Sequence, residues 1–141
     1  MKDNIVMEKI WQESDLLELR IICGSEYITA NQTCYIQSSA LETIRGQIAE
    51  YVENPHQSRS VEFGDKHGNH TPAFSMDILE ISASGHVKIE VDMEIEDNDT
   101  RKHRCLFYVK SELGMLERFG KRLKKLIHRD IGSQVILNEV G

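Results

Sequence analysis

The sequence lacks the features that mark a secreted or membrane-spanning protein. No stretch approaches the roughly 18 consecutive apolar residues that a membrane-spanning helix needs. The segment MKDNIVMEKIWQESD, residues 1–15, carries acidic residues where a signal peptide needs an unbroken apolar run. Cys23, Cys34 and Cys105 are odd in number and widely spaced, which favours free thiols over a disulfide framework. We therefore expect a cytoplasmic protein that does not engage a membrane.

Repeats, low-complexity tracts and linkers rich in proline or glycine are absent as well. The chain of 141 residues has the length of one domain that buries its own core. Its hydrophobic fraction of 40% is ordinary for a soluble globular protein and too high for a disordered one. We expect a single domain over residues 1–141.

Recognisable catalytic sequences are also missing, since there is no GxSxG, no HExxH and no glycine-rich phosphate-binding loop. His67 and His70 have the spacing of metal ligands, but they lie in a turn-rich segment with only Asp65 as a further candidate ligand nearby. A zinc site needs three or four ligands on rigid elements. The sequence therefore predicts no metal, no cofactor and no enzymatic activity.

One catalytic alternative involves two other histidines. His86 and His103 fall in two consecutive predicted strands, where they could form an acid–base pair of the ribonuclease kind. The carboxylates near them stand in one exposed row, however, and nothing in such a row pushes their pKa values apart. This pattern favours binding over catalysis.

Charge is divided unevenly along the chain. Residues 1–100 hold 7 Lys and Arg against 19 Asp and Glu, a net charge of −12, whereas residues 101–141 hold 10 against 4, a net charge of +6. The acidic body argues against nucleic acid as a direct ligand, because phosphate binding needs a basic surface. Residues 121–129 are basic, but they lack interleaved aromatics, and cations suit a helix C-terminus. RNA binding by this segment is the weaker alternative.

Hydrophobic patterning predicts strands and helices of an α+β fold. Strands are expected at residues 16–23, 27–36, 59–63, 73–82, 86–96 and 101–110, with an edge strand in QVILN at 134–138. Ser84 and Gly85 should turn the fourth of these into the fifth as an antiparallel hairpin. The order, roughly β-β-α-β-β-β-β-α, predicts an antiparallel sheet of about five to six strands with two helices packed on it.

Both predicted helices have start signals and one apolar face. Ser39 and Glu42 have the spacing of a capping box, and NPH at residues 54–56 should end that helix. Ser111 should cap the second helix. The expected apolar stripes are Leu41, Ile44, Ile48, Tyr51 and Val52 in the first helix, and Leu113, Leu116, Phe119, Leu123, Leu126 and Ile127 in the second.

The segment HVKIEVDMEIE, residues 86–96, alternates without a break. Its odd positions are apolar and its even positions titratable, so one face of the strand is apolar and the other charged. We predict that the charged face and the following loop bind a basic protein partner, because such complementarity speeds association and excludes wrong partners. The predicted partner-binding residues are Glu90, Asp92, Glu94, Glu96, Asp97 and Asp99.

The alternative interpretation of this strand is a solvated face that its neighbour neutralises. Arg101, Lys102 and Arg104 begin the next predicted strand and could lie opposite Glu94 and Asp92. Exposed cross-strand ion pairs of this kind contribute only about a few tenths of a kcal/mol each to stability. About five carboxylates against three cations leave a negative surplus, which favours the partner-binding interpretation.

Two segments resemble a known family. GHVKIEVDMEI at residues 85–95 and HRCLFYVKSELGMLERFGKRLKKL at 103–126 are similar to the C-terminal half of WapI-type immunity proteins. In that family a Gly-His strand leads to an aromatic strand and then to a helix that starts near a short polar-Leu segment. An earlier helix and a strand like FSMDILEIS stand in the same order, so the resemblance spans residues 16–127.

The resemblance implies a cytosolic immunity protein encoded beside a toxin. The toxin would be the C-terminal domain of a wall-associated, repeat-containing protein used in contact-dependent inhibition, and such domains are often nucleases, including tRNA-cleaving ones. An acidic inhibitor can occupy the phosphate-binding surface of a nuclease. We therefore expect an inhibitor of a basic toxin domain. The alternative is a non-catalytic, small-ligand-binding or regulatory α+β domain.

Overall fold

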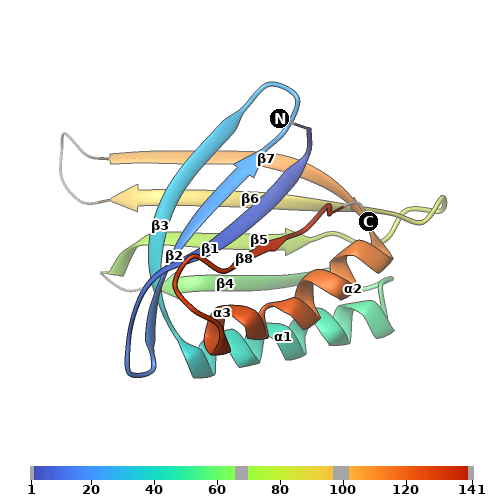
Figure 1. Cartoon of the computed structure of the whole chain (residues 1–141). Coiled ribbons are helices and arrows are strands. Elements are labelled where there is room, and N and C mark those ends of the chain that lie inside the picture. The colour runs from blue at the N-terminus through green and yellow to red at the C-terminus, as the bar shows by residue number, and fades with distance from the viewer. Residues whose placement is uncertain (1, 66–69, 97–101, 140–141) are drawn as a thin grey trace.

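The fold is given by a computed structural model, which describes residues 2–65, 70–96 and 102–139 (Figure 1). In chain order the elements are β1 (Asn4–Glu13), β2 (Leu16–Gly24), β3 (Thr29–Gln37), α1 (Ser38–Glu53), β4 (Arg59–Asp65), β5 (His70–Ile78), β6 (His86–Glu96), β7 (Lys102–Glu112), α2 (Leu113–Arg122), α3 (Lys124–His128) and β8 (Gln134–Ile136).

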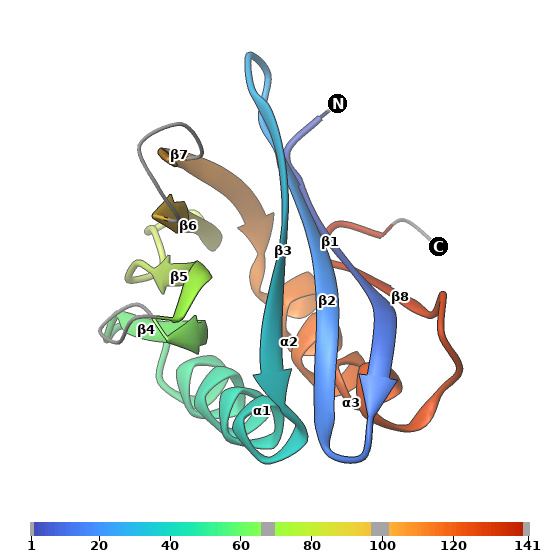
Figure 2. The ribbon, with the colours of Figure 1, turned by 90° about the vertical axis from the view of Figure 1, so that its left-hand side faces the viewer.

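The strands form two antiparallel sheets of four strands each. The first has the order β3-β2-β1-β8 and the second the order β4-β5-β6-β7. Figure 2 looks nearly along the strands of the second sheet, whereas β1, β2 and β3 run lengthwise in the same view, so the strands of the two sheets cross steeply. The helices close the space between the sheets at one end (Figure 2). One hydrophobic core joins both sheets and all three helices.

The α+β class and the antiparallel pairing are confirmed, with two differences from the sequence-based expectation. The strands are divided between two sheets instead of forming one, and the chain begins with β1, which the sequence did not predict. From Ile5 to Lys9 every second side chain of β1 is buried, and the third of them is Lys9, which is 2% exposed. Because Lys9 is charged, the sequence does not continue the apolar alternation that Ile5 and Met7 begin.

The predicted hairpin and its third strand are confirmed. Chain reversal occurs at Gly85, whose φ of +86° favours glycine, and Ile78 pairs with Ile89 beyond it. β7 then pairs with β6 along its whole length. The apolar side of β6 is buried as expected from its alternation: Val87, Ile89, Val91 and Met93 are each at most 1% exposed. β8 lies at the edge of the first sheet, beside β1.

Both predicted helix caps are wrong, although both apolar stripes are confirmed. α1 follows β3 directly and has Gln37 as its N-cap, so Ser39 already lies inside the helix and makes no capping bond. The Ser38 N–H instead donates to the carbonyl of Asp15 at 2.8 Å. Ser111 belongs to β7, and Glu112 precedes α2 without a side-chain cap. In both places the chain passes from strand to helix without a connecting residue, so the last strand residue takes the cap position and its side chain makes no capping bond.

The two long helices approach closely at one glycine. A Cβ atom built on Gly120 of α2 would lie 2.7 Å from Cγ2 of Ile48 in α1. Both residues are buried, so only a glycine allows this contact. The contact positions α2 against α1 and thereby fixes where β7, which leads into α2, leaves the second sheet.

Asn138 ties the two sheets together. Its backbone N–H donates to Oδ1 of Asn4 in β1, and its side-chain Nδ2 donates to the carbonyl of Lys110 in β7, both at 2.8 Å. Its Oδ1 accepts from the Ser111 hydroxyl at 2.7 Å. At the opposite junction, Nε2 of Gln32 in β3 donates to the carbonyl of Ala73 in β5 at 2.6 Å. These bonds hold the β4–β7 sheet in one orientation against the first.

Candidate protein-binding surface

The outer face of the β4–β7 sheet gathers carboxylates from three adjacent strands. Alternation turns apolar side chains of these strands to the core, as in Val61, Phe63, Met76 and Ile89, and turns the residues between them outward. Apart from Glu112, which lies opposite His86 at the end of β7, the outward carboxylates whose side chains are described are Glu62 on β4, Asp77 on β5, and Glu90, Asp92 and Glu94 on β6. We call these five residues the acidic face.

Strand register arranges the acidic face in three neighbouring rows across the sheet. One row holds Ser60, Asp77, Glu90 and Tyr108. The next holds Glu62, Ser75, Asp92 and Leu106, and the third holds Ala73, Glu94 and Arg104. Within the described parts of these rows, Arg104 is the only cation beside five carboxylates. The adjacent row holds Lys88 opposite Lys110, so the negative surplus expected from the sequence lies within these three rows.

Asp92 is the most enclosed carboxylate of the acidic face. Its side chain is only 8% exposed, and Arg104 holds both of its oxygens, Nε at 3.1 Å from Oδ1 and Nη2 at 2.8 Å from Oδ2. This hydrogen bonding, with the charge of Asp92, raises the pKa of Arg104, and the charges of Glu94 and Glu90 act in the same direction. A bidentate pair of this kind is geometrically fixed. Asp92 therefore organises the face more than it offers itself to a partner.

Two exposed apolar side chains border the acidic face on β7. Leu106 is 47% exposed and Tyr108 is 45% exposed, each in the same row as a carboxylate of β6. Hydrogen bonding to the Glu90 carboxylate raises the pKa of the Tyr108 phenol, and the Glu90 charge adds to the shift. The ammonium of Lys88 lies 5.5 Å from the centre of the Tyr108 ring. Glu90 therefore holds the hydroxyl group of Tyr108, and Lys88 lies over its ring.

Three of the six predicted partner-binding residues lie on this face. Glu90, Asp92 and Glu94 alternate along β6 as predicted. Glu96 ends β6 opposite Lys102, and only its backbone is described. Asp97 and Asp99 lie outside the described residues.

Sequence reasoning missed four residues of this surface: Glu62, Asp77, Leu106 and Tyr108. The signal was available, because the hairpin at Gly85 fixes the register of β5 on β6, and alternation then places Asp77 outward beside Glu90. Of the three cations that could neutralise the carboxylates of β6, Arg104 is the one whose side chain is described, and it pairs with Asp92. Arg101 lies outside the described residues, and of Lys102 only the backbone is described.

The histidines considered for catalysis are not brought together. His86 starts β6 opposite Glu112, and its Nδ1 lies 2.8 Å from Oε1 of that residue, whereas His103 lies opposite Ile95 near the other end of the strand pair. Nine residues of strand separate the two rows, about 30 Å. The acid–base pair suggested by the sequence is therefore wrong.

Cysteines and possible metal ligands do not form a reactive cluster in the described part of the chain. Cys23 and Cys34 are buried in the first sheet, and burial raises the pKa of both thiols, that of Cys34 to about 12. Among residues 2–65, 70–96 and 102–139 no group of three His, Cys, Asp or Glu side chains is placed to hold a metal ion. Of the predicted candidate pair, His67 lies outside these residues, and only the backbone of His70 is described.

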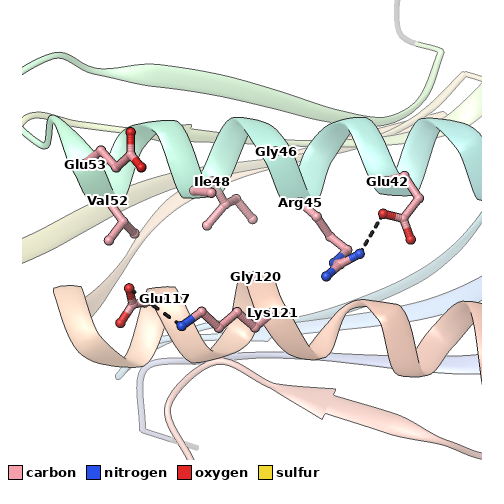
Figure 3. Close-up of a pocket in the computed structure, with 10 residues that line it drawn as sticks. Glu42, Arg45, Gly46, Ile48, Val52, Glu53, Glu117, Gly120 and Lys121 are labelled. Atoms are coloured by element: carbon pink, nitrogen blue, oxygen red, sulfur yellow. Dashed lines mark hydrogen bonds and ion pairs between the residues drawn. The ribbon is translucent and has the colours of Figure 1, made fainter.

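An open groove of about 470 Å³ runs between α1 and α2. Its floor is formed by Gly46, Ile48 and Gly120, and charged residues rim it (Figure 3). Arg45 and Glu42 pair on one helix at 2.6 Å, and Lys121 pairs with Glu117 on the other at 3.9 Å (Figure 3). This groove is where the small-ligand alternative would place its ligand.

The basic segment at residues 121–129 lies on α2 and α3. Lys124, Lys125, His128 and Arg129 are exposed and line one shallow depression, and Arg122 pairs with Glu139 at 2.5 Å. The exposed aromatic residues of the described chain, Trp11, Tyr27, Tyr35 and Tyr108, all lie on or between strands, and none of them lines this depression. The arrangement lacks the stacking rings that single-stranded RNA binding uses.

No helix among the described residues is long and apolar enough to cross a membrane. Comparison with protein-family models, curated proteins and solved structures found no match to this chain. The candidate surface is therefore interpreted from its own residues.

Proposed function

We propose that this protein is an immunity-type inhibitor that binds a basic toxin domain on the acidic face. The observation that carries the proposal is the position of five carboxylates in three adjacent rows on β4, β5 and β6, with Arg104 as the only described cation in those rows. Rigid strands hold these charges in a fixed pattern. A flat, preformed surface of one charge suits a folded partner of the opposite charge.

Charge in this pattern acts mainly on association. The whole chain has a net charge of −6, and the acidic face concentrates negative charge on one side of one sheet. A field of this kind steers a basic partner and raises its association rate by one to three orders of magnitude at low salt. Arg104 neutralises Asp92, so Glu90 and Glu94 on either side supply most of the attraction for a basic partner.

Leu106 and Tyr108 give the surface an apolar margin. Protein interfaces are depleted of charge at their centre and enriched in tyrosine. Tyr108 is held by Glu90 and Lys88, so little side-chain entropy is lost when a partner covers the ring. Charge would bring the partner to the face, and these two side chains would slow its dissociation.

A nuclease domain is the kind of basic partner that the sequence resemblance implies. Glu90 and Glu94 lie on either side of the paired Asp92 along β6, about 13 Å apart, and Asp77 lies beside Glu90 on β5. Cations that a nuclease uses to bind phosphates can bind these carboxylates instead. The immunity protein would then block the surface through which the toxin holds its substrate.

Co-expression tests this proposal directly. The toxin domain encoded beside this chain is expressed with and without it, and survival and co-purification are measured. The proposal predicts that the chain protects the cells and co-purifies with the toxin domain. Protection without a complex, or a complex that leaves the toxin active, would contradict inhibition by binding. The small-ligand alternative predicts neither protection nor a complex.

A further inference from the structure

β7 forms one edge of its sheet. The sheet order ends at β7, which pairs with β6 alone among the described strands. The pairing is regular from His86 opposite Glu112 to Glu96 opposite Lys102, without a bulge. Figures 1 and 2 show β7 as the outermost strand of this sheet. A long, regular edge strand offers unpaired backbone groups to another strand.

The direction of each backbone group on β7 follows from its neighbours. The Lys88 carbonyl accepts from the Leu79 N–H, so even-numbered residues of β6 point their backbone groups toward β5 and odd-numbered ones toward β7. Odd-numbered residues of β7 lie opposite odd-numbered residues of β6, so the even-numbered residues of β7 point outward. Lys110 fits this pattern, because its N–H donates to Oδ2 of Asp3 and its carbonyl accepts from Asn138, both at 2.8 Å.

The outward backbone groups of Lys110 are thus hydrogen-bonded, unlike those between Arg104 and Tyr108 in the described chain. No described residue bonds the outward backbone groups of Arg104, Leu106 or Tyr108. Leu106 and Tyr108 are nearly half exposed, and the side chain of Arg104 is 60% exposed. Five residues of extended backbone with an exposed leucine at their centre are therefore available for pairing.

We propose that a second copy of this chain pairs its β7 with this edge, antiparallel and with the two-fold axis at Leu106. In this register the outward backbone groups of Arg104 face those of Tyr108 in the second copy, and the two Leu106 residues face each other. Leu106 gains an apolar contact with its counterpart, and each Arg104 lies opposite Tyr108 of the second copy. The contact between Arg104 and Tyr108 occurs twice, once on each side of the two-fold axis.

Other registers fit this edge less well. An axis at Arg104 would place two guanidinium groups side by side, and an axis at Tyr108 would require the backbone groups of Lys110, which Asp3 and Asn138 already occupy. A second copy in the register centred on Leu106 places Tyr108 opposite each Arg104, and the paired segment ends at Tyr108, before the occupied backbone groups of Lys110.

The dimer would join the two β4–β7 sheets into one sheet of eight strands. Both acidic faces would then lie on the same surface of that sheet, and the two-fold axis would pass between them. This arrangement does not depend on the proposed inhibitor function, and its test uses only the purified chain.

Sedimentation velocity across a range of protein concentrations tests the dimer. The wild-type mass should rise with concentration from 16.2 kDa to twice that value. Leu106→Pro should remain at 16.2 kDa, because it removes an outward N–H while every bond between β6 and β7 stays intact. Leu106→Lys should also remain monomeric, since it places two ammonium groups at the axis, and Leu106→Ala should dimerise more weakly than wild type.

Leu106→Lys keeps the test decisive even where the proline variant fails to fold. Hydrogen exchange supplies a second readout, in which the amides of Arg104, Leu106 and Tyr108 become protected as concentration rises. A wild-type chain that stays at 16.2 kDa at every concentration would overturn the proposal. A dimer that neither Leu106→Lys nor Leu106→Pro weakens would overturn it too, because the contact would then lie elsewhere.

Discussion

Arg104 reaches diagonally across the strand pair to Asp92, although its backbone lies opposite Glu94. The guanidinium therefore holds the one carboxylate of the acidic face that is nearly enclosed and leaves Glu94 more open. Asp92 is 8% exposed in its side chain, against 60% for Arg104, so the two residues contribute unequally to stability.

This inequality gives the first prediction. Asp92→Asn should lower the free energy of unfolding by about 1 kcal/mol, because one charged hydrogen-bonded pair becomes neutral. Arg104→Met should cost more than Asp92→Asn, since it removes the guanidinium that holds both oxygens of an enclosed carboxylate beside Glu90 and Glu94. Urea denaturation of both single variants and the double variant measures the effect. Equal losses for the two single variants would show that the enclosed carboxylate does not need Arg104.

The second prediction concerns the contact between Gly120 and Ile48. Gly120→Ala should destabilise the protein by about 1–2 kcal/mol, because the new methyl group would lie 2.7 Å from Ile48 and overpacks the helix pair. Gly46→Ala is the matched control: Gly46 lies inside α1 with nothing within 4 Å of its Cβ position, so alanine should stabilise the helix by up to about 1 kcal/mol. Thermal unfolding shows whether the two variants shift in opposite directions. A stabilising Gly120→Ala would contradict the close contact.

The third prediction concerns the buried lysine of β1. Nζ of Lys9 donates to Oε1 of Gln12 at 2.7 Å, and burial lowers the pKa of Lys9 from its ordinary value of 10.5, with a smaller opposing effect from Asp130. Lys9→Met should therefore raise stability at neutral pH by about 1 kcal/mol.

The pH dependence of that gain has a defined sign. The folded pKa lies below the unfolded one, so wild-type stability rises with pH between the folded value and 10.5. The advantage of Lys9→Met should shrink over this interval, as measured by urea denaturation at several alkaline pH values. An advantage that stays constant or grows would mean that Lys9 is not desolvated on folding.

The fourth prediction concerns the thiols. Burial raises the pKa of Cys34 to about 12 and that of Cys23 also well above its ordinary value, whereas Cys105 is partly exposed on β7. At pH 8 the folded protein should expose one fast-reacting thiol to a disulfide reagent, and peptide mapping should assign it to Cys105. All three thiols should react after denaturation without a reductant. Fast labelling of Cys34 in the folded protein would contradict its place in the core.

Sequence patterns predicted those parts of the fold in which one face of an element is uniformly apolar. The alternation of Val87 to Met93 and the helical spacing of Leu41 to Tyr51 are of this kind, and both were confirmed. β1 was missed because Lys9 interrupts its apolar face. The division into two sheets was missed because α1 separates β3 from β4, and alternation within a strand does not show which neighbour the strand joins.

The candidate site was predicted less completely, for a related reason. Alternation placed Glu90, Asp92 and Glu94 on one face, and the expected proximity of Arg104 to Glu94 and Asp92 was confirmed. The enclosure of Asp92 depends on how far one arginine side chain extends across the strands, which no local pattern encodes. Tyr108 belongs to the surface because of the register of β7 on β6, and the sequence does not determine that register.

The association rate between this protein and its proposed partner, a basic toxin domain, tests the central claim most directly. Glu90→Lys with Glu94→Lys reverses two charges of the acidic face and leaves the pair of Asp92 and Arg104 in place. Glu13→Lys with Glu26→Lys is the control, because both residues are exposed and belong to the other sheet or its loops. The first pair should slow association about ten-fold or more at low salt, with a difference that shrinks as salt rises, and the control should have a much smaller effect. Association as fast as that of the control at every ionic strength would contradict the claim that the toxin binds the acidic face.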